Sequence, residues 1–133
     1  MTWWQGYEFC QNSCYINNET VPPYLTEIYS QEQQDFITET IVFNDELFEF
    51  DSWWIGLRYS FVPAEGLRWR WFNSKVIADF TAWSPDFPTN GRETVALMVR
   101  DLVYEWIPIK QPPPTGNEDD VEKSYPICQF IPF

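Results

Sequence analysis

The run WWIGLRY (residues 53–59) predicts a core strand, because it combines aromatic and aliphatic residues over a length typical of strands. Four further runs of the same character follow it, each bounded by turn residues: LRWRWF (67–72), TVALMVR (94–100), LVYEWI (102–107) and YPICQF (125–130). Residues 73–93 form a long stretch rich in Ser, Pro, Asp, Asn and Gly, and residues 110–123 form a Pro-rich and then acidic insertion. A loop as long as residues 73–93 is uncommon inside a compact domain and is often functional.

Before the core strand the apolar residues repeat with a helical period. In residues 2–11, Trp3, Gly6 and Cys10 lie at helical spacing, so we expect a first, short helix there. Ser30 and Gln33 form a capping-box pattern, and an apolar face follows it at Phe36, Ile37 and Ile41. We therefore expect a second helix from Ser30 to about residue 42, preceded by a short strand at Leu25–Tyr29. Two helices followed by strands with intervening loops indicate an α+β fold, and the length suits a single domain over residues 1–133.

Composition and charge exclude several classes of partner. Aromatic residues make up 20% of the chain, with eight Trp, which argues against disorder. The formal net charge of -12 repels nucleic-acid phosphates and anionic membrane surfaces, so we expect neither as a partner. No apolar run approaches the ~20 residues that span a bilayer. The start, MTWWQGYEFC, lacks the basic and apolar regions of a signal peptide, so the chain either stays in the cytosol or is cut from a longer secreted or membrane protein.

The usual catalytic constellations are missing from the sequence. The chain has no His, which removes Ser-His-Asp and Cys-His catalysis in their usual forms and argues against zinc. It also has no phosphate-binding loop or dinucleotide fingerprint. Glu118, Asp119 and Asp120 lie in the Pro-containing insertion, where a solvated acidic loop is favoured over acid–base chemistry. We expect a protein that is not an enzyme and that uses no cofactor.

Six segments of the chain resemble, in the same order, the C-type lectin-like domain family. TWWQGYEFC resembles the first helix of that family, LTEIYSQEQQDFI the start of its second helix, and WWIGL its WIGL core strand. WRWFNSKVIADFTAWSP resembles the segment that leads into the family's long loop, GRETVALM the strand after it, and YPICQF the closing strand. The resemblance implies a C-type lectin-like fold with two helices, short antiparallel strands and a long loop region. It also implies a first strand before the first helix, which this sequence lacks. We therefore expect an excised or truncated domain, or a partial gene product, whose last strand, residues 125–132, has an open edge.

The resemblance also bears on the three cysteines. In the family, the first-helix Cys bonds to the Cys of the last strand, and these positions match Cys10 and Cys128. The alternative is a pair of free buried thiols. The second bridge of the family is absent, because its positions fall at Val95 and about Gln111. Cys14 is left over, and it either pairs with another chain, giving a covalent dimer, or remains an unpaired thiol.

Sugar-binding members of the family hold Ca²⁺ through side-chain oxygens, and the hydroxyls of the sugar complete the shell of the ion. The matching positions here read Phe87, Thr89, Glu93, Ile107 and Pro108, and of these only Glu93 keeps its ligand. The resemblance therefore implies that the primary calcium site is lost. Pro88 matches a proline that is cis in the family, so we expect a cis Phe87–Pro88 bond.

The candidate ligand-binding residues are those at or beside the lost calcium site: Phe87, Pro88, Thr89, Glu93, Trp106 and Ile107. Phe87 and Ile107 stand where a sugar docks in the family. Apolar groups there suit a protein-binding face, a calcium-free platform for sugar rings, or simply a core into which both side chains turn.

These observations together predict an extracellular or cell-surface recognition module of the receptor type, within a longer protein. We expect its ligand to be a protein, bound independently of calcium. The alternative is a carbohydrate-binding lectin domain with a degenerate site. Asn18 begins an N-glycosylation sequence, Asn-Glu-Thr, in an expected loop, which agrees with secretion. A dimer through Cys14 or through the open strand edge is a further expectation.

Overall fold

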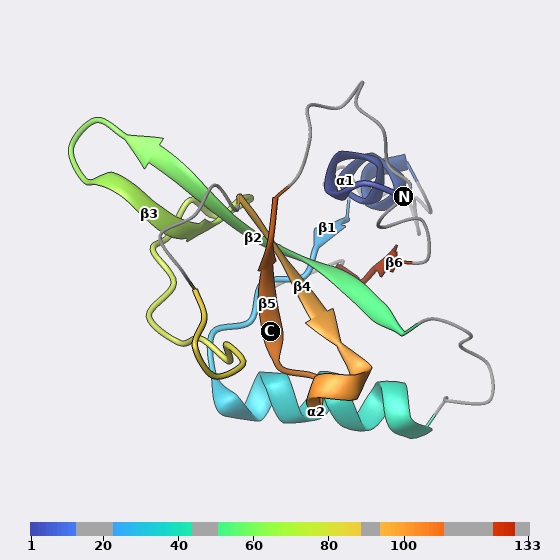
Figure 1. The fold of residues 1–133 in the computed structure, drawn as a ribbon. Helices are drawn as coiled ribbons and strands as arrows, with labels where there is room; N and C mark the ends of the chain where they lie inside the picture. Colours follow the sequence, from blue (N-terminus) through green and yellow to red (C-terminus); the bar gives the residue numbers. More distant parts are fainter. Residues whose placement is uncertain (13–22, 44–50, 89–93, 111–123, 130–133) are drawn as a thin grey trace.

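A computed structural model describes residues 1–12, 23–43, 51–88, 94–110 and 124–129. Figure 1 shows two helices arranged around a twisted set of strands. In chain order the elements are α1 (Trp3–Asn12), β1 (Tyr24–Leu25), α2 (Gln31–Phe43), β2 (Ser52–Val62), β3 (Gly66–Trp71), β4 (Val95–Val99), a 3₁₀ turn (Arg100–Leu102), β5 (Trp106–Ile109), β6 (Ser124–Pro126) and β7 (Cys128–Gln129). This order confirms the α+β class that the sequence predicts.

The long strand β2 organises the main sheet, whose order is β3-β2-β4-β5, with β6 pairing parallel to β2. The first residues of β2, from Ser52 to Trp54, pair with β4 and β6. Its later residues, from Leu57 to Val62, pair with β3 and form a hairpin that projects from the body of the molecule (Figure 1). One strand therefore belongs to the core in its first half and to an extended hairpin in its second.

Both helices begin with side-chain caps. At α1 the bonds are reciprocal: the Thr2 amide donates to Gln5 Oε1 (2.9 Å), and the Gln5 amide donates to Thr2 Oγ1 (3.1 Å). At α2 the Gln33 amide donates to Ser30 Oγ (3.2 Å), as the capping pattern predicts. The side-chain oxygen of Gln33, however, accepts from the amide of Tyr29, one residue before the expected partner.

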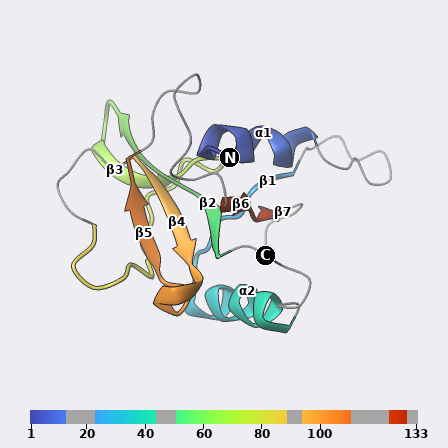
Figure 2. The same ribbon diagram turned by 45° about the vertical axis from the view of Figure 1, so that its right-hand side comes forward.

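The apolar side chains form two clusters, one on each side of the main sheet. The cluster on the α2 side contains Ile28, Ile37, Ile41, Trp53, Ile55, Leu57, Trp71, Ala96, Met98 and Trp106. The cluster on the α1 side contains Trp3, Cys10, Leu25, Trp54, Val95 and Leu97. Successive residues of β2 and β4 alternate between the two clusters, as the period of two requires. Figure 2 shows the corresponding placement of α1 and α2 on opposite sides of the strands.

The predicted core is largely confirmed, with one correction. Four of the six tryptophans of the strands and long loop are buried: Trp53, Trp54, Trp71 and Trp106. Val95, which stands at a family cysteine position, is fully buried in the α1-side cluster. Phe36 was predicted on the apolar face of α2 and is 56% exposed, because the residues of α2 that meet the sheet are Ile37 and Ile41.

The strand predicted at residues 102–107 is wrong over its first half. Val103 and Tyr104 have left-handed backbone, with φ of 55° and 62°, and β5 begins at Trp106. The reversal is closed by bonds from the Tyr104 amide to the Val99 carbonyl (2.9 Å) and from the Val99 amide to the Glu105 carbonyl (3.1 Å). A tight hairpin of this kind needs positive φ at its centre. The pairing of β4 with β5 therefore overrides the β-branched and aromatic composition of the turn.

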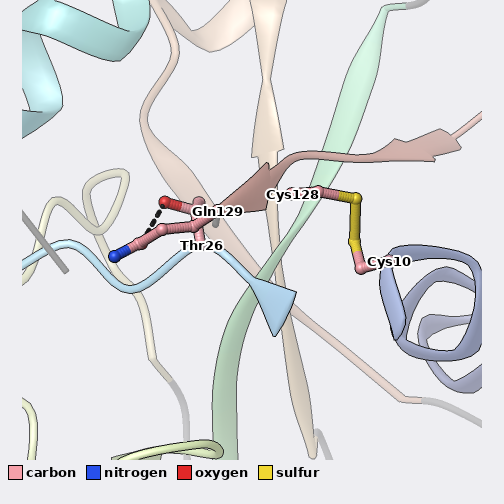
Figure 3. Close-up of a disulfide and its surroundings, with 4 residues drawn as sticks. All are labelled: Cys10, Thr26, Cys128 and Gln129. Atoms are coloured by element: carbon pink, nitrogen blue, oxygen red, sulfur yellow. Dashed lines mark hydrogen bonds between the residues drawn. A yellow bond between two sulfur atoms is a disulfide. The ribbon is translucent and has the colours of Figure 1, made fainter. Parts of the chain in front are cut away.

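The predicted bond between Cys10 and Cys128 is confirmed, with the two Cα atoms 5.4 Å apart, and it ties α1 to β7 (Figure 3). Beside it, β7 pairs antiparallel with β1, with Leu25 opposite Cys128. The strand predicted at Leu25–Tyr29 is therefore shorter and begins one residue earlier. Gln129 strengthens this pairing, because its Oε1 accepts from the Thr26 hydroxyl (3.0 Å; Figure 3).

The two closing strands have one strand partner each within the described residues: β1 for β7, and β2 for β6. One side of each is thus without a strand partner in that part of the chain. Residues 130–132 of the predicted last strand lie outside the described residues.

Candidate ligand-binding face

The described part of the long loop, residues 73–88, is tied along its length to β3 and β5. The Ala78 amide donates to the Trp69 carbonyl (3.0 Å). Trp106 bonds the loop twice: its amide donates to the Ala82 carbonyl (2.8 Å), and its carbonyl accepts from the Ser84 amide (2.8 Å). The loop is therefore an irregular segment with a fixed backbone path, which is the setting in which loop side chains bind ligands.

The start of the loop is held by a buried carboxylate that sequence reasoning missed. Glu27 is almost fully buried, and its Oε2 accepts from the amides of Asn73 (2.8 Å) and Ser74 (3.1 Å). Its Oε1 accepts a short hydrogen bond from the Tyr29 hydroxyl. Burial, and then this bond to Glu27, raise the pKa of Tyr29 to about 12. The signal in the sequence is the single acidic residue of the otherwise uncharged run LTEIY.

Trp106 lies beneath the loop. It is fully buried, and its indole Nε1 donates to Gln34 Oε1 of α2 (3.1 Å). Its ring meets that of Trp83 in the loop edge-on, with centroids 5.9 Å apart, and Trp83 in turn meets Trp69 of β3 at 4.8 Å. Trp106 was expected among the ligand-binding residues. In the structure it supports the loop from the core and presents no surface to a ligand.

Phe87 lies on the surface, at the end of the described loop. A turn precedes it, in which the Phe87 amide donates to the Ser84 carbonyl (3.2 Å) and Asp86 has a φ of 72°. Phe87 is 39% exposed and Pro88 is also exposed, so both side chains are accessible. The peptide bond between them is cis, as predicted.

Ile107 points away from this surface. It is the neighbour of Trp106 in β5, so it projects to the other side of the sheet, where it pairs with Leu97. There it is half-buried and packs against the α1-side cluster. Of the apolar residues that replace calcium ligands, Phe87 is thus on the surface and Ile107 turns inward.

The described residues at the family's calcium position do not fit a calcium ion. Phe87, Ile107 and Pro108 have no side-chain oxygen, and Ca²⁺ requires six to eight oxygen ligands. Within the residues that the structure describes, no group of three or more His, Cys, Asp or Glu side chains could hold a metal ion. Four other predicted site residues lie outside the described part of the chain: Thr89, Glu93, Cys14 and Asn18.

Comparison with known proteins identifies the fold. No protein-family model and no curated protein matches the sequence. The structure is similar to that of the C-type lectin CEL-I from Cucumaria echinata, at 16% identity over 84% of this chain and 76% of that chain (TM-score 0.62). It is also similar to the mouse scavenger receptor C-type lectin carbohydrate-recognition domain, at 21% over 83% and 72% (TM-score 0.60), and to the cow C-type carbohydrate-recognition domain of CD23, at 24% over 84% and 71% (TM-score 0.56). The chain therefore has the C-type lectin-like fold that its sequence motifs imply.

Proposed function

We propose that this chain is a non-enzymatic recognition module that binds a protein ligand through the surface of its long loop, without calcium. One observation carries the proposal: Phe87 and Pro88 are exposed at the position where sugar-binding members of the family hold calcium. An exposed aromatic side chain on a supported backbone can anchor a protein contact, because little conformational freedom is lost when it is covered.

The support of the loop backbone just before Phe87 favours this use. Trp83 packs between Trp69 and Trp106, and the backbone on either side of Trp83 is bonded to Trp106. A ligand that covers Phe87 therefore meets a pre-organised loop and does not have to order it. Single exposed aromatic residues are common on protein surfaces, so the position of Phe87 on the long loop matters more than its exposure alone.

Calcium independence is the part of the proposal with the sharpest physical test. A ligand that binds only the folded state at 100 times its Kd adds ~2.7 kcal/mol to the free energy of unfolding. We expect the Tm to be the same in excess Ca²⁺ and in EDTA, because a site built on Glu93 and water would compete poorly with bulk hydration. A rise in Tm of several degrees with Ca²⁺, abolished by Glu93→Ala, would overturn this part of the proposal.

The ligand class can be tested with two arrays, one of extracellular protein domains and one of glycans, each probed in Ca²⁺ and in EDTA. We expect specific binding on the protein array in both conditions, and its loss in Phe87→Asp. The matched control is Phe61→Asp, because Phe61 is also exposed (65%) and lies on the β2–β3 hairpin. Binding that both variants lose equally, or that only EDTA removes, contradicts the proposed face.

Carbohydrate binding is the second candidate, and the exposed ring of Phe87 is also what favours it, because an aromatic face can stack on a sugar ring. Two of the similar solved structures are described as carbohydrate-recognition domains, and another is described as a complex with GlcNAc. Binding on the glycan array in EDTA that Phe87→Asp removes, without specific binding on the protein array, would select this candidate.

We also propose an extracellular or cell-surface location. The bond between Cys10 and Cys128 supports it, because structural disulfides form and persist in oxidising compartments. Among the described helices, neither is long and apolar enough to cross a membrane. Expression with a secretion signal should give oxidised protein, whereas stable, fully reduced and functional protein from the cytosol would argue against this location.

A further inference from the structure

Two arginines stand directly opposite each other on the β2–β3 hairpin. Arg58 of β2 is the register partner of Arg70 of β3, so both side chains project to the same side of the hairpin. Directly opposed like charges destabilise an antiparallel pair unless something of opposite charge lies between or beside them. The arrangement is unexpected in a chain whose formal net charge is -12.

The described residues neutralise this pair only in part. Arg70 is 2% exposed and forms an ion pair with Glu65 (3.0 Å), and its Nη2 donates to the Gly66 carbonyl (3.1 Å). Arg58 has no such carboxylate: its guanidinium lies over the rings of Trp4 (4.4 Å) and Trp3 (4.8 Å). Arg58 Nη1 and Arg70 Nε are buried and have no hydrogen-bond partner among the described residues.

Arg58 and Arg70 both line a pocket. Its volume is about 190 Å³, and its polar lining includes Arg58, Ser60, Arg70 and Lys75, with Val62 and Phe72 among its apolar walls. Three of the chain's eight Lys and Arg residues thus line one small pocket. Burial lowers the pKa of Arg58, because the charged guanidinium has lost part of its hydration.

We propose that this pocket binds the oxyanion group of a small ligand, a sulfate ester or an equivalent acidic group. An oxyanion would lie between Arg58, Arg70 and Lys75, where its negative charge relieves their mutual repulsion. Charge-assisted bonds of guanidinium to oxyanions are among the strongest hydrogen bonds in proteins. The hydroxyl of Ser60 adds a further donor, and Val62 and Phe72 cover the less polar part of the ligand.

Size and charge restrict the ligand to a small one. Pockets for drug-sized molecules measure about 300–1,000 Å³, and this pocket is smaller. The strongly acidic molecule repels polyanions, and charges more than ~8 Å away are largely screened at physiological salt, so only a local, single anionic group benefits from the arginines. A nucleic acid or a long sulfated polymer does not fit these conditions.

The pocket is separate from the long-loop surface. Trp69, the residue before Arg70, projects to the other side of the hairpin, where it meets Trp83 of the long loop. Arg58, in contrast, contacts Trp3 and Trp4 of α1. The oxyanion pocket is therefore lined by the hairpin and the first residues after it, and none of its lining residues belongs to the proposed protein-binding surface at Phe87 and Pro88.

The first experiment measures binding of inorganic sulfate by isothermal titration and by chemical-shift changes of arginine side-chain N–H groups, with chloride at matched ionic strength as the reference. Lys75→Gln is the test variant, because Lys75 is exposed and its removal should not disturb folding. Arg68→Gln is the matched control: Arg68 is exposed on the same strand, changes the net charge equally, and does not line the pocket. We expect Lys75→Gln to weaken sulfate binding about three- to tenfold, and Arg68→Gln to change it less than twofold.

Arg58→Gln should abolish sulfate binding. If that variant does not fold, the comparison of Lys75→Gln with Arg68→Gln decides whether the pocket binds sulfate. Equal losses in Lys75→Gln and Arg68→Gln would show a general electrostatic effect and overturn the proposal. No binding of sulfate beyond that of chloride would also overturn it. A second arm compares the binding of inorganic sulfate with that of N-acetylglucosamine 6-sulfate. Tighter binding of the sugar sulfate, without binding of the neutral sugar, assigns the oxyanion to an organic ligand. Equal binding of the two assigns it to a free anion.

Discussion

Removal of the bond between Cys10 and Cys128 should be the most damaging small change to this fold. The test variant replaces both cysteines by Ala, in a background where Cys14 is also Ala, so that no thiol remains to exchange. The two residues are 118 apart in sequence, and the chain-entropy model gives a loss of about 5 kcal/mol for a loop of that length. For a domain of this size a loss of 1 kcal/mol lowers the Tm by roughly 3–5 °C, so the Tm should fall by about 15–25 °C.

The assay is equilibrium unfolding in urea, followed by tryptophan fluorescence and far-ultraviolet circular dichroism. The model places the effect in the unfolded state, because the released chain is more expanded and exposes more surface. The dependence of the free energy of unfolding on urea should therefore become steeper in the variant. Cys14→Ala alone is the control for the loss of a thiol. A loss below about 2 kcal/mol, with an unchanged urea dependence, would refute the entropic account of this bond.

Three further changes test individual features of the fold. Gly56→Ala should cost about 3 kcal/mol in urea unfolding, because the added Cβ would lie 2.7 Å from the backbone carbonyl oxygen of Leu25; a loss under 1 kcal/mol would mean that this approach is not tight. Val103→Asn should raise the free energy of unfolding by about 1 kcal/mol, because Val103 is 79% exposed and has left-handed backbone, which Asn tolerates better; no gain would contradict strain at this turn. Tyr29 has a raised pKa in the folded state, so as pH rises the unfolded chain loses this tyrosine proton first. The free energy of unfolding should therefore fall as pH rises from about 10 to 12. Tyr29→Phe should reduce that fall, and an equal fall in both proteins would exclude Tyr29 as its source.

The elements that the sequence predicts well are those set by local pattern. The apolar run that begins at Trp53 predicts a core strand, and in the structure it is the buried part of β2, with Trp53 and Ile55 in one cluster and Trp54 in the other. The start of α2 follows from Ser30, whose hydroxyl needs only a neighbouring amide three residues on. The disulfide was not available from local pattern at all, and came from the resemblance of two distant segments to one family.

The elements that the sequence does not predict depend on contacts between distant residues. Val103 has a strand-forming side chain, and only the pairing of β4 with β5 places it in a turn. Glu27 looks like a surface carboxylate until the amides of Asn73 and Ser74 are brought to it. Neither the register nor the loop path can be deduced from the neighbours of these residues in sequence.

The candidate site also has residues that the sequence predicts correctly and residues whose placement depends on distant contacts. Phe87 is exposed, as a protein-binding interpretation needs, whereas Ile107 is turned inward by its place in β5. The neighbouring Trp106 necessarily projects to the opposite side, and its burial removes it from direct contact with a ligand. The paired arginines, Arg58 and Arg70, are visible only once the register of the hairpin is known.

The bond between α1 and β7 also determines how the domain transmits mechanical force. A pull applied outside Cys10 and Cys128 travels from the helix through two sulfur atoms into the last strand, and the polypeptide between the cysteines bears none of it. Under tension in a longer chain, the part of the domain between the two cysteines then does not extend. After reduction the same load falls on the β1–β7 pairing, whose register among the described residues joins Tyr24 to Gln129 and Leu25 to Cys128. Single-molecule pulling should thus show a long extension step in reductant and none in its absence. The redox state of the surroundings then determines how easily the domain is extended.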